Sequence, residues 1–369
     1  NTDGTCTANI TNRQGKNLII NGAMIIQQQM TSHTTGGQNL TGIKTVDRFS
    51  LNFSGTDNPP TQIPVDVAAG TTPYTLGFRR AFKIINGNQT SGAGSSDQIY
   101  ISQKMEAQNI ATSGWNYLSS SSNITLSFWV KSSVAQNFYG YLLTKDGSSY
   151  LYPFETGSLS ADTWTKITKT ISGNSNLTIN NDNGTGLELV IAPFFGTSKT
   201  GSVSLNAWGA YNSSVRVPDM TSTWYTTDDA TFEITGVQLE VGSHASDFEF
   251  LSHADELRRC QRYFTRIPNQ DASSGYAVLA QGAAHDTNSS MVTFHFPVFM
   301  RTNPSMSTVG SFRLYNGGGI ATSSIVLNTS NVAGATLQVS TSSGIDRYEA
   351  LVFGQNNDSN AAVDFSAEL

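Results

Sequence analysis

Charged side chains are scarce in this sequence. Asp, Glu, Lys and Arg make up 13% of its 369 residues, against roughly 25% in typical soluble proteins. Because neutralising phosphates requires clustered Lys and Arg, the formal net charge of -6 argues against nucleic acid as the main partner. Ser, Thr, Asn, Gln and Gly take the place of charge, which indicates a surface wetted by neutral hydrogen-bonding groups.

Cysteines and long apolar runs are scarce as well. Only Cys6 and Cys260 occur, so the chain is not stapled by disulfides, and we expect a reduced pair. No run of about eighteen apolar residues is present, so we expect no membrane insertion. The length still allows two domains of ordinary size, each with a sizeable core.

Catalytic and metal-binding motifs are also missing. The five histidines are scattered, no Gly-x-Ser-x-Gly elbow accompanies them, and their spacing fits no zinc pattern. Asp228, Asp229 and Glu233 are close in sequence, but spacing alone cannot place two carboxylates across a cleft, as sugar hydrolysis requires. We therefore predict no enzyme activity and no cofactor.

Period-two alternation dominates the rest of the chain. The clearest strand runs from Ile124 to Val130, with its even-numbered apolar residues on one face, which is typical of a strand with one buried face. Similar strands recur between turn signals up to residue 250 and again after Pro268. Many short strands at this spacing predict an all-β fold of antiparallel sandwiches, here over residues 17–250 and 268–369.

One segment, residues 251–267, predicts a short linking helix. Ser252 and Asp255 form a capping box, and the helical period continues to Phe264. Leu257, Cys260 and Phe264 share one face at spacings of three and four. Because so short a helix is marginal alone, we expect this stripe to be buried, either on a domain or as a seam around a three-fold axis.

A long ordered block begins at Ile234 and reads ITGVQLEVGSHASDFEFLSHADELRRCQRYF. Further blocks are NLIINGAM from Asn17, TVDRF from Thr45, FPVFMRTNP from Phe296 and the ending VDFSAEL. Together they resemble bacteriophage tail-fibre and other virion-appendage proteins. The setting ISQKMEAQNI…NITLSFWVKSS additionally resembles jelly-roll domains of the carbohydrate-binding-module type.

These resemblances imply an architecture and a location. Residues 17–250 would form the jelly roll, and the polar residues 1–16 an arm that attaches to other virion proteins. The chain would be a homotrimer, with Leu257, Cys260 and Phe264 at its interface, located in the virion and assembled in the host cytoplasm. Jelly rolls of this type often hold a structural Ca²⁺, which stays open here without assigned ligands.

The implied function is attachment to host surface glycans by multivalent, non-catalytic binding. Sugars present apolar C–H faces that stack on exposed aromatic rings. The candidate glycan-binding residues are Tyr139, Tyr141, Tyr150, Tyr152, Trp208, Tyr211, Trp224 and Tyr225. The alternative for each is that it fills the core or a subunit interface.

Two other functions stay open. A head fibre or decoration protein with an assembly or stabilising role would bury its aromatic residues against the capsid or tail. A polysaccharide-degrading tailspike would need a long repetitive β-helix or a carboxylate-lined groove, and the sequence shows no repeat of suitable period.

Overall fold

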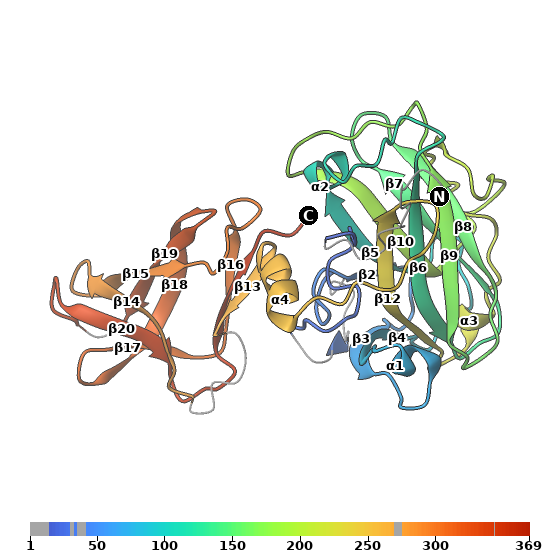
Figure 1. The fold of residues 1–369 in the computed structure, drawn as a ribbon. Helices are drawn as coiled ribbons and strands as arrows, with labels where there is room; N and C mark the ends of the chain where they lie inside the picture. Colours follow the sequence, from blue (N-terminus) through green and yellow to red (C-terminus); the bar gives the residue numbers. More distant parts are fainter. Residues whose placement is uncertain (1–14, 30–32, 35–41, 269–274, 343) are drawn as a thin grey trace. The chain divides into compact units, whose positions relative to one another are not determined.

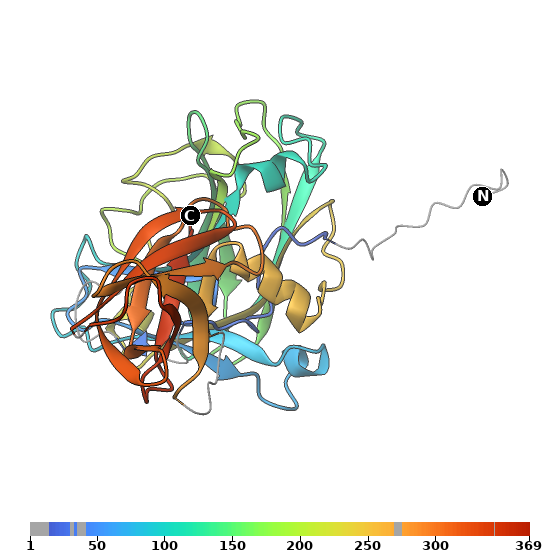
Figure 2. The ribbon, with the colours of Figure 1, turned by 90° about the vertical axis from the view of Figure 1, so that its left-hand side faces the viewer.

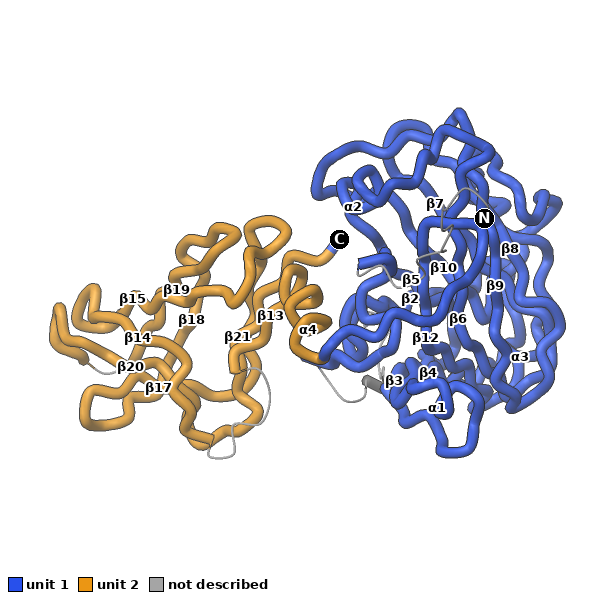
Figure 3. Tube along the Cα trace, in the orientation of Figure 1, with its two compact units in different colours: residues 1–252, 369 blue, residues 253–368 orange. Residues whose placement is uncertain are grey.

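The computed structural model describes residues 15–29, 33–34, 42–268, 275–342 and 344–369 (Figure 1). The chain divides into two compact units, residues 1–252 with 369 and residues 253–368 (Figure 3). Most described elements are strands, which confirms the all-β class. No helix in the described ranges is long and apolar enough to span a membrane. The predicted arm, apart from its last two residues, lies outside the described residues.

The N-terminal unit is built from two six-stranded antiparallel sheets. The first sheet contains, in spatial order, β1 (His33–Thr34), β3 (Thr61–Asp66), β4 (Arg80–Ile85), β12 (Thr231–Val241), β6 (Asn123–Ser132) and β9 (Thr165–Ser172). The second contains β11 (Gly209–Ala210), β8 (Tyr150–Ser158), β7 (Asn137–Thr144), β10 (Thr185–Phe195), β5 (Gln98–Glu106) and β2 (Ser50–Ser54). Three short helices, α1 (Thr72–Thr75), α2 (Ala107–Ala111) and α3 (Thr223–Thr226), lie in the connections.

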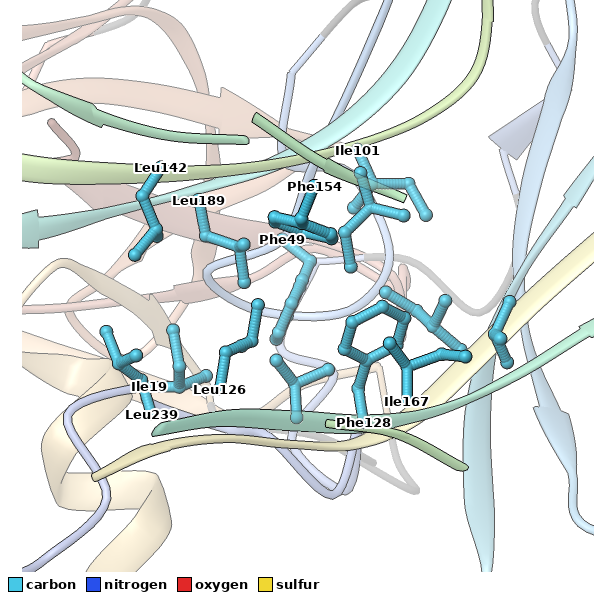
Figure 4. Packing of buried hydrophobic residues seen from close by; sticks show 14 of the residues in the cluster. Ile19, Phe49, Ile101, Leu126, Phe128, Leu142, Phe154, Ile167, Leu189 and Leu239 are labelled. Atoms are coloured by element: carbon cyan, nitrogen blue, oxygen red, sulfur yellow. The ribbon is translucent and has the colours of Figure 1, made fainter. Parts of the chain in front are cut away.

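The main core lies between these two sheets. Leu142 and Leu189 of the second sheet point toward Leu126 and Phe128 of the first (Figure 4). This confirms the inward face predicted for β6. The opposite face of β6 is covered too, since Trp129 is packed with Phe78 in a second cluster, and period-two alternation alone did not predict that.

An irregularity in β12 interrupts the predicted strand. Its pairing with β6 shifts register between Thr235 and Gln238, and Gly236 there has a φ of +63°. A Cβ atom on Gly236 would lie 2.6 Å from the ring of Phe78. Both the left-handed backbone and the close ring require glycine at this position.

The segment from Asn17 to Gly22 is irregular and lies alongside β12. The backbone N–H of Leu18 donates to the carbonyl of Leu239 at 2.9 Å, and that of Val237 to Gly22 at 2.9 Å. The buried Asn17 side chain donates to the carbonyl of Val237 at 3.1 Å and accepts from the N–H of Leu239 at 3.0 Å. An amide side chain therefore replaces the ladder partners that a regular strand would supply.

Polar side chains of the long sequence block hold the turn after β12. Gln238 accepts from the backbone N–H of Glu249 at 2.8 Å, and Glu240 accepts from that of Ser246 at 2.8 Å. The Glu249 carboxylate in turn accepts from the backbone N–H of Asn17 at 2.8 Å. The block thus ties its own turn to the first described residues of the chain.

The C-terminal unit begins with α4 (His253–Gln261) and contains two sheets, coloured orange to red in Figure 2. The smaller sheet contains β13 (Phe264–Ile267), β21 (Ala362–Ser366) and β16 (Ser305–Val309). The larger is a closed barrel of β14 (Val278–Ala284), β15 (Ser289–His295), β19 (Gly334–Thr341), β18 (Gly319–Asn331), β17 (Phe312–Tyr315) and β20 (Ala350–Gln355). The sequence predicted a small β-sandwich for this unit, whereas six of its strands close into a barrel.

The predicted linking helix is shorter than expected. It ends at Gln261, and Phe264 begins β13, because residues 264–267 pair with β21. Cys260 and Phe264 are buried in the described chain, whereas Leu257 is half-buried. Two of the three predicted interface residues therefore offer little surface to another subunit, and the homotrimer stays a prediction.

Replacing Asn17 by Ala should destabilise the N-terminal unit by on the order of 3 kcal/mol, because buried backbone groups of Val237 and Leu239 lose their partners. Urea unfolding followed by tryptophan fluorescence isolates this unit, since all five tryptophans lie in it. The control is Asn116→Ala, at an exposed loop position. Equal unfolding midpoints for the two variants would contradict the assigned role of Asn17.

Gly236→Ala should lower the free energy of unfolding by about 2–5 kcal/mol. The new Cβ atom would both strain the left-handed backbone and collide with the ring of Phe78. The same fluorescence measurement applies. Gly209→Ala is the matched control, since a Cβ atom there meets nothing within 4 Å. An unfolding midpoint for Gly236→Ala as high as that of Gly209→Ala would show that the close approach to Phe78 is not a constraint.

Candidate functional site

The outward face of the second sheet carries a group of aromatic residues. In β7 the even-numbered Phe138 and Leu142 enter the core, so Tyr139 and Tyr141 point outward. Tyr100 of β5 lies on the same face. A register irregularity after Ile191 in β10 leaves Phe194 in the core and turns Phe195 outward.

These rings form one connected layer. The ring centroids of Tyr100 and Phe195 are 5.4 Å apart, and those of Tyr141 and Phe195 are 6.3 Å apart and stacked. Tyr141 and Phe195 are buried, whereas Tyr100 and Tyr139 are half-buried. Tyr141 and Phe195 therefore form the base of this layer, and Tyr100 and Tyr139 keep surface available to a ligand.

The connection of residues 196–222 forms a wall on this face. Val217 is buried against the base of this layer, and Tyr211 packs beside it while staying half-buried. The backbone N–H of Phe195 donates to Sδ of Met220 at 3.2 Å. Arg216 places its guanidinium carbon 5.7 Å from the Phe195 ring centroid. We call Tyr100, Tyr139, Tyr141, Phe195 and Tyr211 the tyrosine face.

Polar groups surround the tyrosine face. Glu188 of β10 forms an ion pair with Lys145 at 3.1 Å, and Glu155 of β8 accepts from the side-chain amide of Asn137 at 2.7 Å. Arg216 lies close enough to Tyr100 for its positive charge to offset part of the increase in the pKa of Tyr100 that burial causes. The face therefore offers amide, guanidinium and carboxylate groups around aromatic rings.

Three phenol groups of this face, those of Tyr100, Tyr139 and Tyr141, are held neutral by raised pKa values. Burial, and then the charge of Glu188, raise the pKa of Tyr100, while burial and Glu155 raise that of Tyr139. Burial strongly raises the pKa of Tyr141. A neutral phenol both donates and accepts hydrogen bonds, which suits contacts with hydroxyl groups.

Three of the eight predicted glycan-binding residues meet on this face, namely Tyr139, Tyr141 and Tyr211. Tyr150 and Tyr152 occupy even positions of β8, where Tyr152 is buried in the main core and Tyr150 is half-buried against it, as in the alternative that these rings fill the core. Trp208 also packs there, with its ring 5.3 Å from that of Tyr152 and its indole N–H donating to Ser172.

Trp224 and Tyr225 are fully buried, so the prediction that they bind glycan is wrong. The Trp224 indole donates to the carbonyl of Thr231 at 3.0 Å, and the Tyr225 hydroxyl donates to Asp97 at 3.0 Å. The Tyr225 ring stacks on Phe194 at 4.3 Å. The turn of helix α3 carries both rings into the core.

The sequence reasoning missed Tyr100, Phe195, Glu188 and Arg216. For Tyr100 a signal was present, because Ile99 and Ile101 on either side are core residues, which directs Tyr100 outward. The orientation of Phe195 depends on the irregularity in β10, and Arg216 reaches the face through a long connection. Neither feature has a periodic signature.

Metal binding has no clear location on this unit. Within the described ranges, no group of three His, Cys, Asp or Glu residues is arranged to hold an ion. The Asn180–Gly184 stretch folds onto Asp146, which accepts from the backbone and side-chain N–H groups of Asn180 at 2.8 and 3.0 Å. A structural Ca²⁺ held partly by carbonyl groups stays a prediction.

The sequence matches no family model and no curated protein. Similar solved structures include a protein from Bacteroides thetaiotaomicron described as sugar binding, at 14% identity, covering 61% of this chain and 100% of that one, with a TM-score of 0.31. The N-terminal cellulose-binding domain of Cellulomonas fimi β-1,4-glucanase C matches at 10% identity over 53% and 90% of the two chains, with a TM-score of 0.27. A CBM22-1 xylan-binding domain from Paenibacillus barcinonensis matches at 10% over 58% and 94%, with a TM-score of 0.26. At these values the likeness establishes no shared function.

The raised pKa values predict the alkaline behaviour of the protein. Tyr100, Tyr139 and Tyr141 should stay neutral in the folded chain above the ordinary tyrosine pKa of about 10, whereas the unfolded chain ionises them there. Their stabilising contribution is therefore complete below pH of about 10 and is lost as the pH rises through the folded values.

Absorbance at the phenolate band tests this behaviour. In native protein, Tyr141→Phe should leave the absorbance change between about pH 9 and 11 unaltered, and in denatured protein it should remove the contribution of one tyrosine. A reduced change in the native titration would show that Tyr141 is accessible.

Proposed function

We propose that the chain is a bacteriophage virion appendage that attaches to host surface glycans by non-catalytic, multivalent binding through the tyrosine face. The observation that carries the proposal is the pair of half-buried rings, Tyr100 and Tyr139, standing on a floor of buried aromatic residues beside Arg216 and Glu155. A rigid floor keeps these rings in place, so little ordering entropy opposes binding.

The chemistry of this face suits an uncharged sugar. The C–H side of a pyranose ring can lie against Tyr139 or Tyr100. Hydroxyl groups can then donate to Glu155 and accept from Arg216 or from a neutral phenol. Each contact is modest, so a single site would bind weakly, and several copies on one particle would gain avidity through effective concentration.

The virion setting is supported by the sequence blocks and not by the face itself. Their polar residues, including Asn17, Gln238 and Glu249, hold the N-terminal unit together. The blocks therefore support a shared architecture with virion appendages, whereas the tyrosine face supports the binding of a ligand. The attachment arm, the trimer and assembly in the host cytoplasm remain part of the proposal.

Binding of the full chain to intact host cells tests the function. Saturable binding should be lost when surface sugars are oxidised with periodate. Tyr139→Ala and Tyr100→Ala should each weaken the single-site affinity by about three- to ten-fold, because a stacked aromatic contact is removed. Tyr74→Ala, which alters a ring packed under Arg79 elsewhere in the unit, should bind as the unaltered chain does.

Other outcomes decide between the remaining functions. An assembled chain that does not bind cells would favour the head-fibre or decoration role. Binding that survives oxidation would remove glycan as the receptor. Release of shortened oligosaccharides would favour the tailspike and would give the carboxylates near the tyrosine face a catalytic role.

A further inference from the structure

The barrel of the C-terminal unit carries an arginine between two tyrosines. The guanidinium carbon of Arg313 lies over the ring of Tyr276, 4.6 Å from its centroid, and over the ring of Tyr315, 5.3 Å from its centroid. Tyr276 and Tyr315 are exposed residues, at 45% and 44% of their surface. Arg313 and Tyr315 point outward from β17, while the alternate residues Phe312 and Leu314 face the barrel core.

Small and apolar residues surround this pair. Arg313 pairs across the sheet with Gly354, and Gly354 pairs with Val278, which is 63% exposed. Gly319 lies on the other side, where a Cβ atom would come within 3.1 Å of the Arg313 guanidinium. Because Gly319 and Gly354 have no side chains, neither residue covers the Arg313 side chain.

Among the described residues, no neighbouring acid neutralises the charge of Arg313. No carboxylate of the described residues lies within ion-pair distance of it, and its described contacts are the two aromatic rings. The acidic Glu349 instead bonds to Asn316 at 3.0 Å. A guanidinium stacked on a ring keeps its N–H donors pointing outward in its own plane, where they match the two oxygens of a carboxylate.

The barrel also limits what can bind here. Its six strands close on themselves, so the patch offers no free strand edge to which a peptide could add as another strand. A flat, compact ligand fits better than an extended backbone. Tyrosine rings and Val278 suit the C–H side of a sugar ring, and the arginine suits an acid group on that ring.

We propose that Arg313, Tyr276 and Tyr315 form a second site, which binds a carboxylated sugar such as a uronic or sialic acid. The sugar carboxylate accepts two hydrogen bonds from the Arg313 guanidinium, and the ring lies against a tyrosine. This site is on the other unit and does not depend on the tyrosine face, so either site can fail without the other.

Calorimetric titration of the full chain tests the site. The probes are a short oligogalacturonate, a sialylated trisaccharide, and the oligogalacturonate after reduction of its carboxyl groups to alcohols. We expect at least one acidic probe to bind and the reduced probe to bind about ten-fold more weakly or not at all, since a bidentate charged contact is lost. Raising the salt concentration should weaken binding of the acidic probe.

Variants locate the site. Arg313→Gln should weaken binding of the acidic probe by about ten-fold, and Arg313→Lys should recover only part of it, because lysine lacks the planar fork. Arg347→Gln is the matched control, since Arg347 stacks on the single exposed ring of Tyr348 at 5.1 Å. Arg347→Gln should bind the acidic probe as the unaltered chain does.

Several results would overturn the inference. These are no binding of either acidic probe, equal binding of the acidic and reduced probes, or unchanged binding by a folded Arg313→Gln protein. Loss of binding in Tyr139→Ala but not in Arg313→Gln would assign the acidic sugar to the tyrosine face. Unchanged circular dichroism and thermal unfolding of Arg313→Gln would show that a loss is not caused by misfolding.

Discussion

The N-terminal unit depends on one buried amide. Where β12 departs from its ladder at Gly236, the Asn17 side chain bonds to the backbone of Val237 and Leu239 and so fills the place of a missing strand. Gly22 completes the contact, since any side chain there would collide with the carbonyl of Val237. Without these hydrogen bonds, buried backbone N–H and C=O groups of β12 would be unpaired, which would lower the free energy of unfolding.

This arrangement separates architecture from binding. The long sequence block from Ile234 to Phe264 supplies β12, the turn held by Glu240 and Glu249, and helix α4. None of the tyrosine-face residues belongs to it. A block of this kind can therefore stay the same while the outward face of the other sheet changes its ligand, which is the usual relation between a rigid scaffold and a site placed on it.

The sequence predicted what periodicity encodes and missed what depends on tertiary contacts. The alternation from Ile124 to Val130 correctly predicted which face of this strand lies in the core. The capping signal at Ser252 correctly predicted a helix that begins at His253. The helix period did not reveal that Phe264 pairs with β21. Among the candidate rings, strand parity explains why Tyr139 faces outward and Tyr152 inward, whereas the position of Phe195 depends on an irregularity that no local pattern shows.

Hydroxyl-radical footprinting of the full chain, with and without saturating host glycan, tests the central claim most directly. The account predicts that the glycan lowers the oxidation of Tyr100, Tyr139 and Tyr211, and leaves that of Tyr74 on the same unit unchanged. Binding without any protection of these three tyrosines would contradict the claim that the outward face of the second sheet is the glycan site.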